Sequence, residues 1–316
     1  MQAIERLLER NGLRVAATAP AHRDWSQDAA FLRELDACSL VVVNGEGSLH
    51  HDRPEAERLL AVGAYARSRG KPAVLVNAGW EANSPQLAAR LRDFARVCAR
   101  DTRSAQRIRE AGIACDVVGD LSLYLAVSPG PAAAPGAPLA FTDSVDRLKA
   151  LALERCRRTL DASLLSILFP AQGAGGYPRF LREGIAASDL RAPGRLAALL
   201  RARHALWRAS SRRTDEFLAR LAGFGFVVSG RFHACTLALL TGTPFAALAS
   251  NTAKIESLVE DAGLEPWRAR IDLEKAAVTD AARRGWSVAE RRAIDDYVAG
   301  ARSGAERLFR ELKDLA

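Results

Sequence analysis

Two kinds of apolar pattern alternate along the first 125 residues of the chain. Apolar residues spaced three or four apart predict helices, and short continuous apolar runs predict buried strands. The predicted helices are 2–10, 29–38, 54–69, 85–96 and 103–111, and the predicted strands are 13–18, 40–43, 73–77 and 114–118. Strands that alternate with helices are typical of βαβ units, so this part of the chain predicts a doubly wound domain with a parallel sheet.

A second alternation of the same kind follows a stretch rich in proline and glycine at 128–138. This stretch supports neither a helix nor a central strand, so we expect it to link two domains. The strands predicted beyond it are 139–142, 164–169, 225–229 and 244–249, and the helices are 145–160, 213–221, 234–241 and 253–262. We therefore expect an α/β protein of two Rossmann-like domains with a central cleft, formed by residues 1–130 and residues 139–286.

Two segments lie outside this alternation. Residues 172–213 form an insertion far longer than the ~2–6 residues usual between a strand and a helix. Between residues 190 and 213 it has seven arginines and no carboxylate. Its leucines fall near one face and predict a basic amphipathic helix. This helix is either an ordinary exposed helix or a functional surface. In the second case, residues 195–213 would bind anionic lipid or a lipid-diphosphate-linked sugar. Residues 287–316 predict a long helix that packs back across the domain junction.

The composition is that of a folded protein. Apolar residues make up 49% of the chain and charged residues 26%, which excludes wholesale disorder. The longest apolar stretches, such as 234–240, are much shorter than the ~20 residues of a membrane-spanning helix, and residues 1–10 hold no apolar signal core. We therefore expect a cytoplasmic protein whose basic insertion could meet the inner face of the cell membrane.

The charges and the cysteines narrow the choice of ligands. A net charge of +8 favours anionic ligands such as phosphates or anionic sugars. Aromatic residues make up only 6% and do not gather among basic residues, which argues against a nucleic-acid partner. The five cysteines are scattered, and the adjacent residues 50–52 (His-His-Asp) have no partner pair at ligand spacing. The sequence thus predicts no disulfide framework and no metal site.

Turns that follow predicted strands are the candidate sites, because open parallel sheets bind ligands beyond the carboxyl ends of their strands. In the first domain one such turn is Gly45-Glu46-Gly47-Ser48. It either brings the backbone and the amides of a following helix close to an anion, or is a tight turn in which Ser48 caps that helix. A second candidate is the helix start from Arg100 to Ser104. It either binds a carboxylate or phosphate, or is an ordinary cap beside exposed arginines.

In the second domain the buried strand 225–229 is followed by Arg231 and His233. If the chain stays extended through Phe232, both side chains point to the same side. A charged group at the end of a buried strand needs an anionic partner, and histidine transfers protons near neutral pH. The alternative is a structural pair held by backbone carbonyls.

A fourth candidate follows the predicted strand 244–249, where residues 250–252, Asn251 among them, can cap a helix and Lys254 lies in the first turn of that helix. A lysine in the first turn of a helix is unfavourable unless an anion lies beside it. The alternative is an exposed lysine without a ligand.

Together these residues resemble the polysaccharide pyruvyl transferase family. The resemblance is carried by Arg100-Asp101-x-x-Ser104 with Gly112 and Asp120, and by Ser229-x-Arg231-x-His233 with Ala238, Gly242, Pro244 and Lys254. The turn from Gly45 to Ser48 is similar to a glycine-rich turn of the family, with Glu46 where glycine is more usual. The likeness covers most of residues 30–127 and 213–264.

The resemblance implies a GT-B-like fold and transfer of pyruvate from phosphoenolpyruvate onto two hydroxyls of a cell-envelope polysaccharide or a lipid-linked precursor, as a ketal. It implies that Arg100, Ser104, Arg231, Asn251 and Lys254 bind the donor. Arg231 and His233 would be catalytic, with His233 as the acid or base. Neither a metal nor a cofactor besides the donor is implied.

Two departures from the family pattern leave other functions open. Members usually begin with a strand and a glycine-rich turn, whereas Met1 opens on a predicted helix, so we expect that this strand is lost or that the start lies late. The insertion 172–213 also departs from the usual second domain. The same residues would suit a glycosyltransferase with a nucleotide-sugar donor, or a glycan-binding or lipid-binding module without catalysis.

Overall fold

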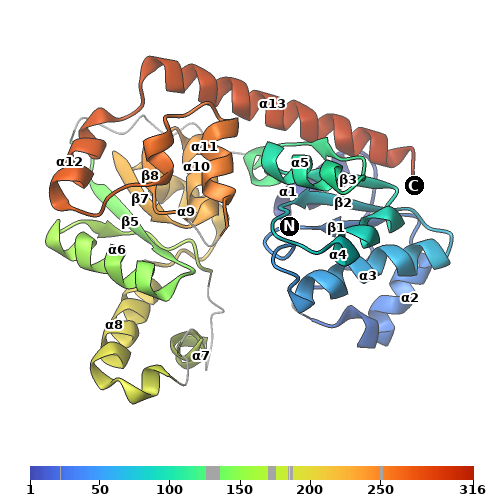
Figure 1. Cartoon of the computed structure of the whole chain (residues 1–316), viewed down its shortest axis with the longest axis horizontal. Coiled ribbons are helices and arrows are strands. Elements are labelled where there is room, and N and C mark those ends of the chain that lie inside the picture. The colour runs from blue at the N-terminus through green and yellow to red at the C-terminus, as the bar shows by residue number, and fades with distance from the viewer. Residues whose placement is uncertain (22, 126–135, 170–175, 184, 186–187, 250–251) are drawn as a thin grey trace. The chain divides into compact units, whose positions relative to one another are not determined.

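The computed structural model describes the chain except for residues 22, 126–135, 170–175, 184, 186–187 and 250–251. The chain divides into two compact units, whose helices and strands are labelled in Figure 1. Unit 1 comprises residues 1–125 and 296–316, and unit 2 comprises residues 126–295. Most of the expected linker at 128–138 lies outside the described residues.

The sheet of unit 1 has four parallel strands in the order of the sequence. These are β1 (Val41–Asn44), β2 (Ala73–Ala78), β3 (Arg96–Ala99) and β4 (Asp116–Val117). The helices of this part of the chain are α1 (Gln2–Arg10), α2 (Ala29–Ala37), α3 (Pro54–Ser68), α4 (Pro85–Ala89) and α5 (Thr102–Glu110). All of β2 is buried, because a central parallel strand is covered on both faces. For the same reason it forms a continuous apolar run in the sequence.

The core of unit 1 joins these helices to the sheet. Leu60 of α3, Leu75 of β2 and Ile108 of α5 are fully buried in one cluster. Full burial of a side chain of this size contributes about 1.5–3 kcal/mol. This packing holds the strand ends, and the polar groups they carry, in fixed positions.

Two predictions for unit 1 are wrong. Residues 13–18 form no strand, since they are mostly exposed and pair with no strand of the described chain. The predicted helix 85–96 is instead the short helix α4 followed by a 3-10 helix at Arg90–Asp93, and strand β3, which begins at the last residue of that prediction, was not predicted. The apolar run of β3 is too short to be told apart from a helical segment by its pattern.

The sheet of unit 2 is also parallel, but its strands do not follow the order of the sequence. Strand β5 (Leu139–Ser144) lies between β6 (Ser163–Leu164) and β7 (Phe226–Gly230), and β8 (Phe245–Ala247) pairs with β7. The order therefore changes direction between β5 and β7. In open α/β sheets ligands bind beyond the carboxyl ends of the strands at such a switch point.

Helices surround this second sheet. They are α6 (Arg147–Thr159), α9 (Thr214–Ala222), α10 (Phe232–Thr241), α11 (Lys254–Asp261) and α12 (Lys275–Arg284). Phe141 of β5 and Val228 of β7 are fully buried in the core that these helices close.

The basic insertion folds as a helical pair within unit 2. Helices α7 (Gly176–Arg182) and α8 (Pro193–Ala209) contact each other, and α8 also packs against β6. It packs against α6 as well (Figure 1). Asp189 lies before α8 and is buried, with Arg147 of α6 at 2.7 Å and Arg195 of α8 at 3.2 Å. These ion pairs anchor the insertion to the body of the unit.

One long helix, α13 (Val288–Lys313), contributes to both units. In unit 2 its Glu290 forms a buried ion pair with Arg268, whose Nη2 lies 2.9 Å from Oε2 of Glu290. In unit 1 Nε of its Arg302 donates to the carbonyl oxygen of Leu123 at 3.0 Å.

Candidate functional site

An arginine and an aspartate meet at the switch point of the unit 2 sheet. Arg231 follows β7, and its Nε donates to Oδ1 of Asp143, the fifth residue of β5, at 2.9 Å. Nη2 of Arg231 donates to the second oxygen of the same carboxylate. The Arg231 side chain is 20% exposed and that of Asp143 7%. The sequence analysis missed Asp143, because its only local signal is an aspartate near the end of an apolar run.

Hydroxyl groups fix the ends of the two strands to each other. The Thr142 hydroxyl lies 3.1 Å from the Ser229 hydroxyl and accepts a hydrogen bond from the Gly230 amide at 3.0 Å. The Arg231 amide donates to the Ser229 hydroxyl, also at 3.0 Å. A Cβ atom on Gly230 would lie 2.6 Å from the carbonyl oxygen of Asp143. Only glycine therefore allows the approach of β7 to β5 that positions Arg231.

His233 does not lie beside Arg231 in the way the sequence predicted. Helix α10 begins at Phe232 and Arg231 is its N-cap residue, so the extended conformation ends before His233. The prediction that both side chains point to one side of a strand is wrong for this reason. His233 is instead the second residue of a helix, partly buried, with its ring 5.1 Å from the Phe232 ring. The amides of a helix N-terminus are suited to binding an anion.

Two lysines lie near the end of β8 in unit 2. Lys254 is the first residue of α11, as predicted, whereas Asn251 lies outside the described residues. Lys149 of α6 was not predicted, and its Nζ donates to the carbonyl oxygen of Ala249 at 2.6 Å. Both lysines add positive charge to the strand ends that carry Arg231.

In unit 1 the glycine-rich turn follows β1. A Cβ atom on Gly45 would lie 2.9 Å from Cα of Ala78, so only glycine fits at this close approach of two strands. Gly47 has a φ of +75°, which glycine adopts without strain. The turn does not lead directly into a helix, because α3 begins at Pro54 with Arg53 as its N-cap. The expectation that Ser48 caps a helix, or that helix amides lie beside the turn, is therefore wrong.

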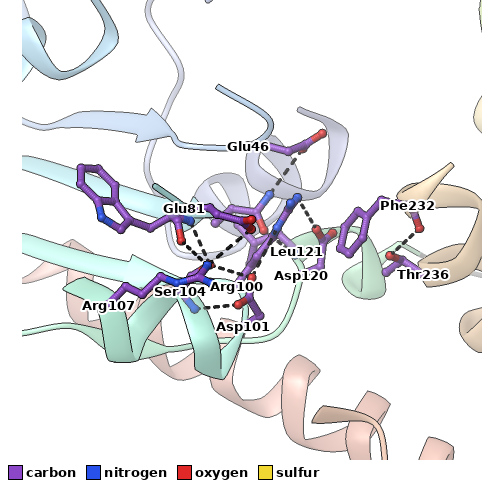
Figure 2. Close-up of polar contacts among 12 residues, drawn as sticks. Glu46, Glu81, Arg100, Asp101, Ser104, Arg107, Asp120, Leu121, Phe232 and Thr236 are labelled. Atoms are coloured by element: carbon purple, nitrogen blue, oxygen red, sulfur yellow. Dashed lines mark hydrogen bonds and ion pairs between the residues drawn. The ribbon is translucent and has the colours of Figure 1, made fainter. Parts of the chain in front are cut away.

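The helix start at Arg100 is buried and internally paired (Figure 2). Asp101 caps α5 and accepts hydrogen bonds from the Ser104 amide at 2.8 Å and the Ser104 hydroxyl at 2.9 Å. The Ser104 hydroxyl accepts in turn from the Trp80 amide at 2.9 Å. The guanidinium of Arg100 lies 3.5 Å from Asp120 and 3.9 Å from Asp101. Its charge thus faces two carboxylates.

Asn77 joins this group and was not predicted. It is buried at the end of β2 with a φ of +57°, a conformation that costs energy for a residue other than glycine. Its side-chain amide donates to Asn44 at 3.3 Å and to Glu46 at 3.4 Å, and its Oδ1 accepts from the Leu121 amide at 3.2 Å. The ends of β1 and β2 in unit 1 are therefore joined by side-chain hydrogen bonds, and Asn77 also holds the residue that follows Asp120, the partner of Arg100. The signal in the sequence that could have identified Asn77 is an asparagine at the end of an apolar run.

The structure thus gathers the predicted residues in two places. Gly45–Ser48, Arg100 and Ser104 lie at the strand ends of unit 1, whereas Arg231, His233 and Lys254 lie at those of unit 2. Among the described residues there is no group of three or more His, Cys, Asp or Glu placed to hold a metal ion. In the same part of the chain, none of the helices combines the length and the apolar character needed to span a bilayer.

Comparisons with known proteins identify a family and a fold. A family model described as polysaccharide pyruvyl transferase matches residues 1–252. The structure of a putative UDP-N-acetylglucosamine 2-epimerase from Listeria monocytogenes has a TM-score of 0.53 at 12% identity, over 98% of this chain and 86% of that one. UDP-GlcNAc 2-epimerase from Methanocaldococcus jannaschii has a TM-score of 0.51 at 14% identity, over 98% and 89%. A search of curated proteins found no match.

The structural likeness concerns the fold alone at these identities. With the two parallel sheets, it confirms the expected α/β class of two Rossmann-like domains with a GT-B-like architecture.

Proposed function

Since the chain belongs to the polysaccharide pyruvyl transferase family and is a transferase of that kind, we propose that it moves pyruvate from phosphoenolpyruvate onto two hydroxyls of one sugar. The sugar belongs to a cell-envelope polysaccharide or its lipid-linked precursor. The enol carbon of the donor gains a proton, one hydroxyl adds to the neighbouring carbon, and the bond from that carbon to the phosphate oxygen breaks. The second hydroxyl adds to the same carbon. The products are a cyclic ketal and inorganic phosphate. One of the two hydroxyl protons balances the proton taken up by carbon, and the other leaves on the phosphate as hydrogen phosphate.

One observation carries the proposal beyond family membership. The Arg231 guanidinium lies at the switch point of the unit 2 sheet, directly before the N-terminus of α10. Its pair with Asp143 uses Nε and Nη2. Because a guanidinium carries five N–H donors in a planar fork, Arg231 can hold Asp143 and a substrate anion together. A planar fork and a helix N-terminus both suit the carboxylate and phosphate of phosphoenolpyruvate.

The remaining roles are carried over from the family resemblance. In the proposed reaction Lys254 adds positive charge for the donor, Asn251 gives a polar contact, and His233 is the acid or base that moves the proton. In unit 1 Arg100 is paired with carboxylates and the Ser104 hydroxyl is held in a helix cap. We therefore assign the main attraction for the donor to the strand ends of unit 2, whereas donor binding by Arg100 and Ser104 stays a prediction from the family resemblance.

The test offers both possible donors to the purified full-length chain. It is titrated by calorimetry with phosphoenolpyruvate and with UDP-GlcNAc, then incubated with each donor and a panel of polysaccharide acceptors. We expect phosphoenolpyruvate to bind and inorganic phosphate to be released only when an acceptor is present. Release of UDP instead would make the chain a nucleotide-sugar glycosyltransferase. Binding of neither donor would make it a glycan-binding or lipid-binding module.

His233→Ala tests the proton-transfer role. We expect turnover to fall at least ~100-fold, the usual scale for a general acid or base, with donor affinity changed only a few-fold. His204→Ala is the matched control, because His204 is an exposed histidine on α8, and its turnover should equal that of the wild type. Normal turnover of His233→Ala would refute the assignment.

We also propose that the enzyme works in the cytoplasm and that its insertion meets anionic lipid at the inner face of the membrane. Arg201 and Arg208 support this, since both are exposed and they lie seven residues apart, on one side of α8. Replacing both by glutamine should lower flotation with phosphatidylglycerol vesicles at low salt and have little effect at high salt. Equal flotation of the variant and the parent at low salt would eliminate this contact.

A further inference from the structure

Three large apolar side chains are exposed around one ion pair of unit 2. Val145 and Leu148, at the start of α6, are 50% and 66% exposed, and Leu190, before α8, is 64% exposed. Arg147 precedes Leu148 in the chain and Asp189 precedes Leu190, and Nη1 of Arg147 lies 2.7 Å from Oδ2 of Asp189. This ion pair brings the two leucines, which are remote in the sequence, to one part of the surface. We call Val145, Leu148 and Leu190 the apolar patch.

Buried contacts hold the apolar patch in place. Asp189 is fully buried and also lies 3.2 Å from Nε of Arg195 on α8. At the start of α6, Asp146 accepts hydrogen bonds from the Leu148 amide at 2.8 Å and from the Lys149 amide at 3.0 Å. Both segments that carry the patch are thus fixed, and the fold itself keeps the leucines at the surface. A single exposed leucine is ordinary, but neighbouring ones on a fixed backbone mark an interaction surface.

The charges beside the apolar patch indicate which partner it fits. The segments 145–149 and 188–195 hold four basic residues, Arg147, Lys149, Arg191 and Arg195, and two carboxylates, Asp146 and Asp189. Both carboxylates are engaged within the protein, by helix amides and by arginines, whereas Arg191 is exposed. Exposed leucines beside an excess of positive charge fit an anionic bilayer, because leucine side chains enter its apolar region while arginines meet the lipid phosphates.

We propose that the apolar patch inserts into an anionic lipid bilayer and docks unit 2 on it. This inference rests on the proposed function and deepens its membrane contact, since Arg201 and Arg208 supply charge, whereas the patch supplies apolar contact that salt does not screen. Val145 lies two residues after Asp143, the partner of Arg231. Docking therefore brings the end of β5 close to the bilayer surface, where the sugar of a lipid-linked precursor is held.

Vesicle flotation at two salt concentrations tests the insertion. The full-length wild type, a double variant with Leu148→Asn and Leu190→Asn, and the control Val288→Asn are floated with phosphatidylglycerol vesicles. Val288 is a matched control because it is 70% exposed at the start of α13 in the same unit. We expect partition at low salt to fall at least ~10-fold in the double variant, the scale of two leucines that are partly transferred from water. Val288→Asn should partition like the wild type. At high salt the wild type should retain a bound fraction that the double variant loses.

Equal partition of the double variant and the wild type would overturn the inference. A wild type that does not float would also overturn it and would leave the patch to a protein partner. If the double variant fails to fold, judged by its circular dichroism, Leu190→Trp decides in its place. Its added fluorescence, taken as the difference from the wild type, should be quenched by vesicles with brominated acyl chains, and unquenched fluorescence would overturn the inference.

Two further measurements separate the inference from the proposed function. Weaker flotation of Arg201→Gln with Arg208→Gln, beside normal flotation of the leucine double variant, would retain the contact through charge and reject only the insertion. Phosphoenolpyruvate binding, measured by calorimetry, should be the same in the double variant and the wild type. A wild type that floats through the patch but binds no phosphoenolpyruvate would reject the pyruvate transfer and support the docking.

Discussion

The ion pair between Asp143 and Arg231 should affect both stability and turnover, and Asp143→Asn tests it without changing the shape of the side chain. Two N–H groups of Arg231 donate to this carboxylate, and a hydrogen bond to a charged group contributes about 1.5–3 kcal/mol. Loss of one partner of a fully buried pair costs about 3–5 kcal/mol. Because the Arg231 side chain is 20% exposed, water replaces part of the lost interaction, and we expect a loss of about 2–3 kcal/mol.

Urea unfolding followed by circular dichroism measures this loss, and steady-state kinetics measures the second effect. Without the carboxylate, Arg231 is free to change its orientation, so we expect kcat to fall at least ~10-fold. KM for phosphoenolpyruvate should change less, because the variant also removes a negative charge that repels the donor. Asp215→Asn is the matched control: its pair with Arg213 is exposed, at 61% and 75%, so water screens it and its loss should have little effect on stability. Wild-type stability together with wild-type kcat in Asp143→Asn would refute the argument.

Two further predictions concern the fold. Gly45→Ala should destabilise unit 1 by about 1–3 kcal/mol, because the added Cβ would lie 2.9 Å from Cα of Ala78; an unchanged Tm would contradict this. Burial alone would raise the pKa of Glu290, but hydrogen bonds, chiefly from Arg268, lower it from 4.5 to about 2. The charged pair therefore stabilises the fold by about 3 kcal/mol above pH ~5, and this is lost as the pH falls toward 2. The stability gap between wild type and Glu290→Gln, measured by urea unfolding, should narrow over that range, and a constant gap would show that the pair does not titrate.

The strands were predictable where they are long and buried on both faces. Strands β2 and β7 are buried at every position, and each begins with an unbroken apolar run, 73–76 and 226–228, that the local sequence reveals. Strand β3 is only four residues long, and its pattern merged with that of the preceding helix. A run that short carries too little periodicity to separate a strand from a helix.

The candidate site was predictable only in part, and a physical reason separates the features that could be predicted from those that could not. Arg231 and His233 could be identified as candidates because they follow a buried strand, and the end of an apolar run is visible in the local sequence. Their geometry was not predictable, since the point at which α10 begins decides it.

The order of apolar and polar residues by itself determined the α/β class, the repeated strand–helix units and the strand ends at which charged groups emerge. The tertiary structure alone decided which groups meet there. Asp143 lies 88 residues before Arg231, and the pairing of β5 with β7 brings the two together. The reason is that periodicity records which side of an element is buried. The partner of a charged side chain depends on strand order and helix packing, which join residues remote in the sequence.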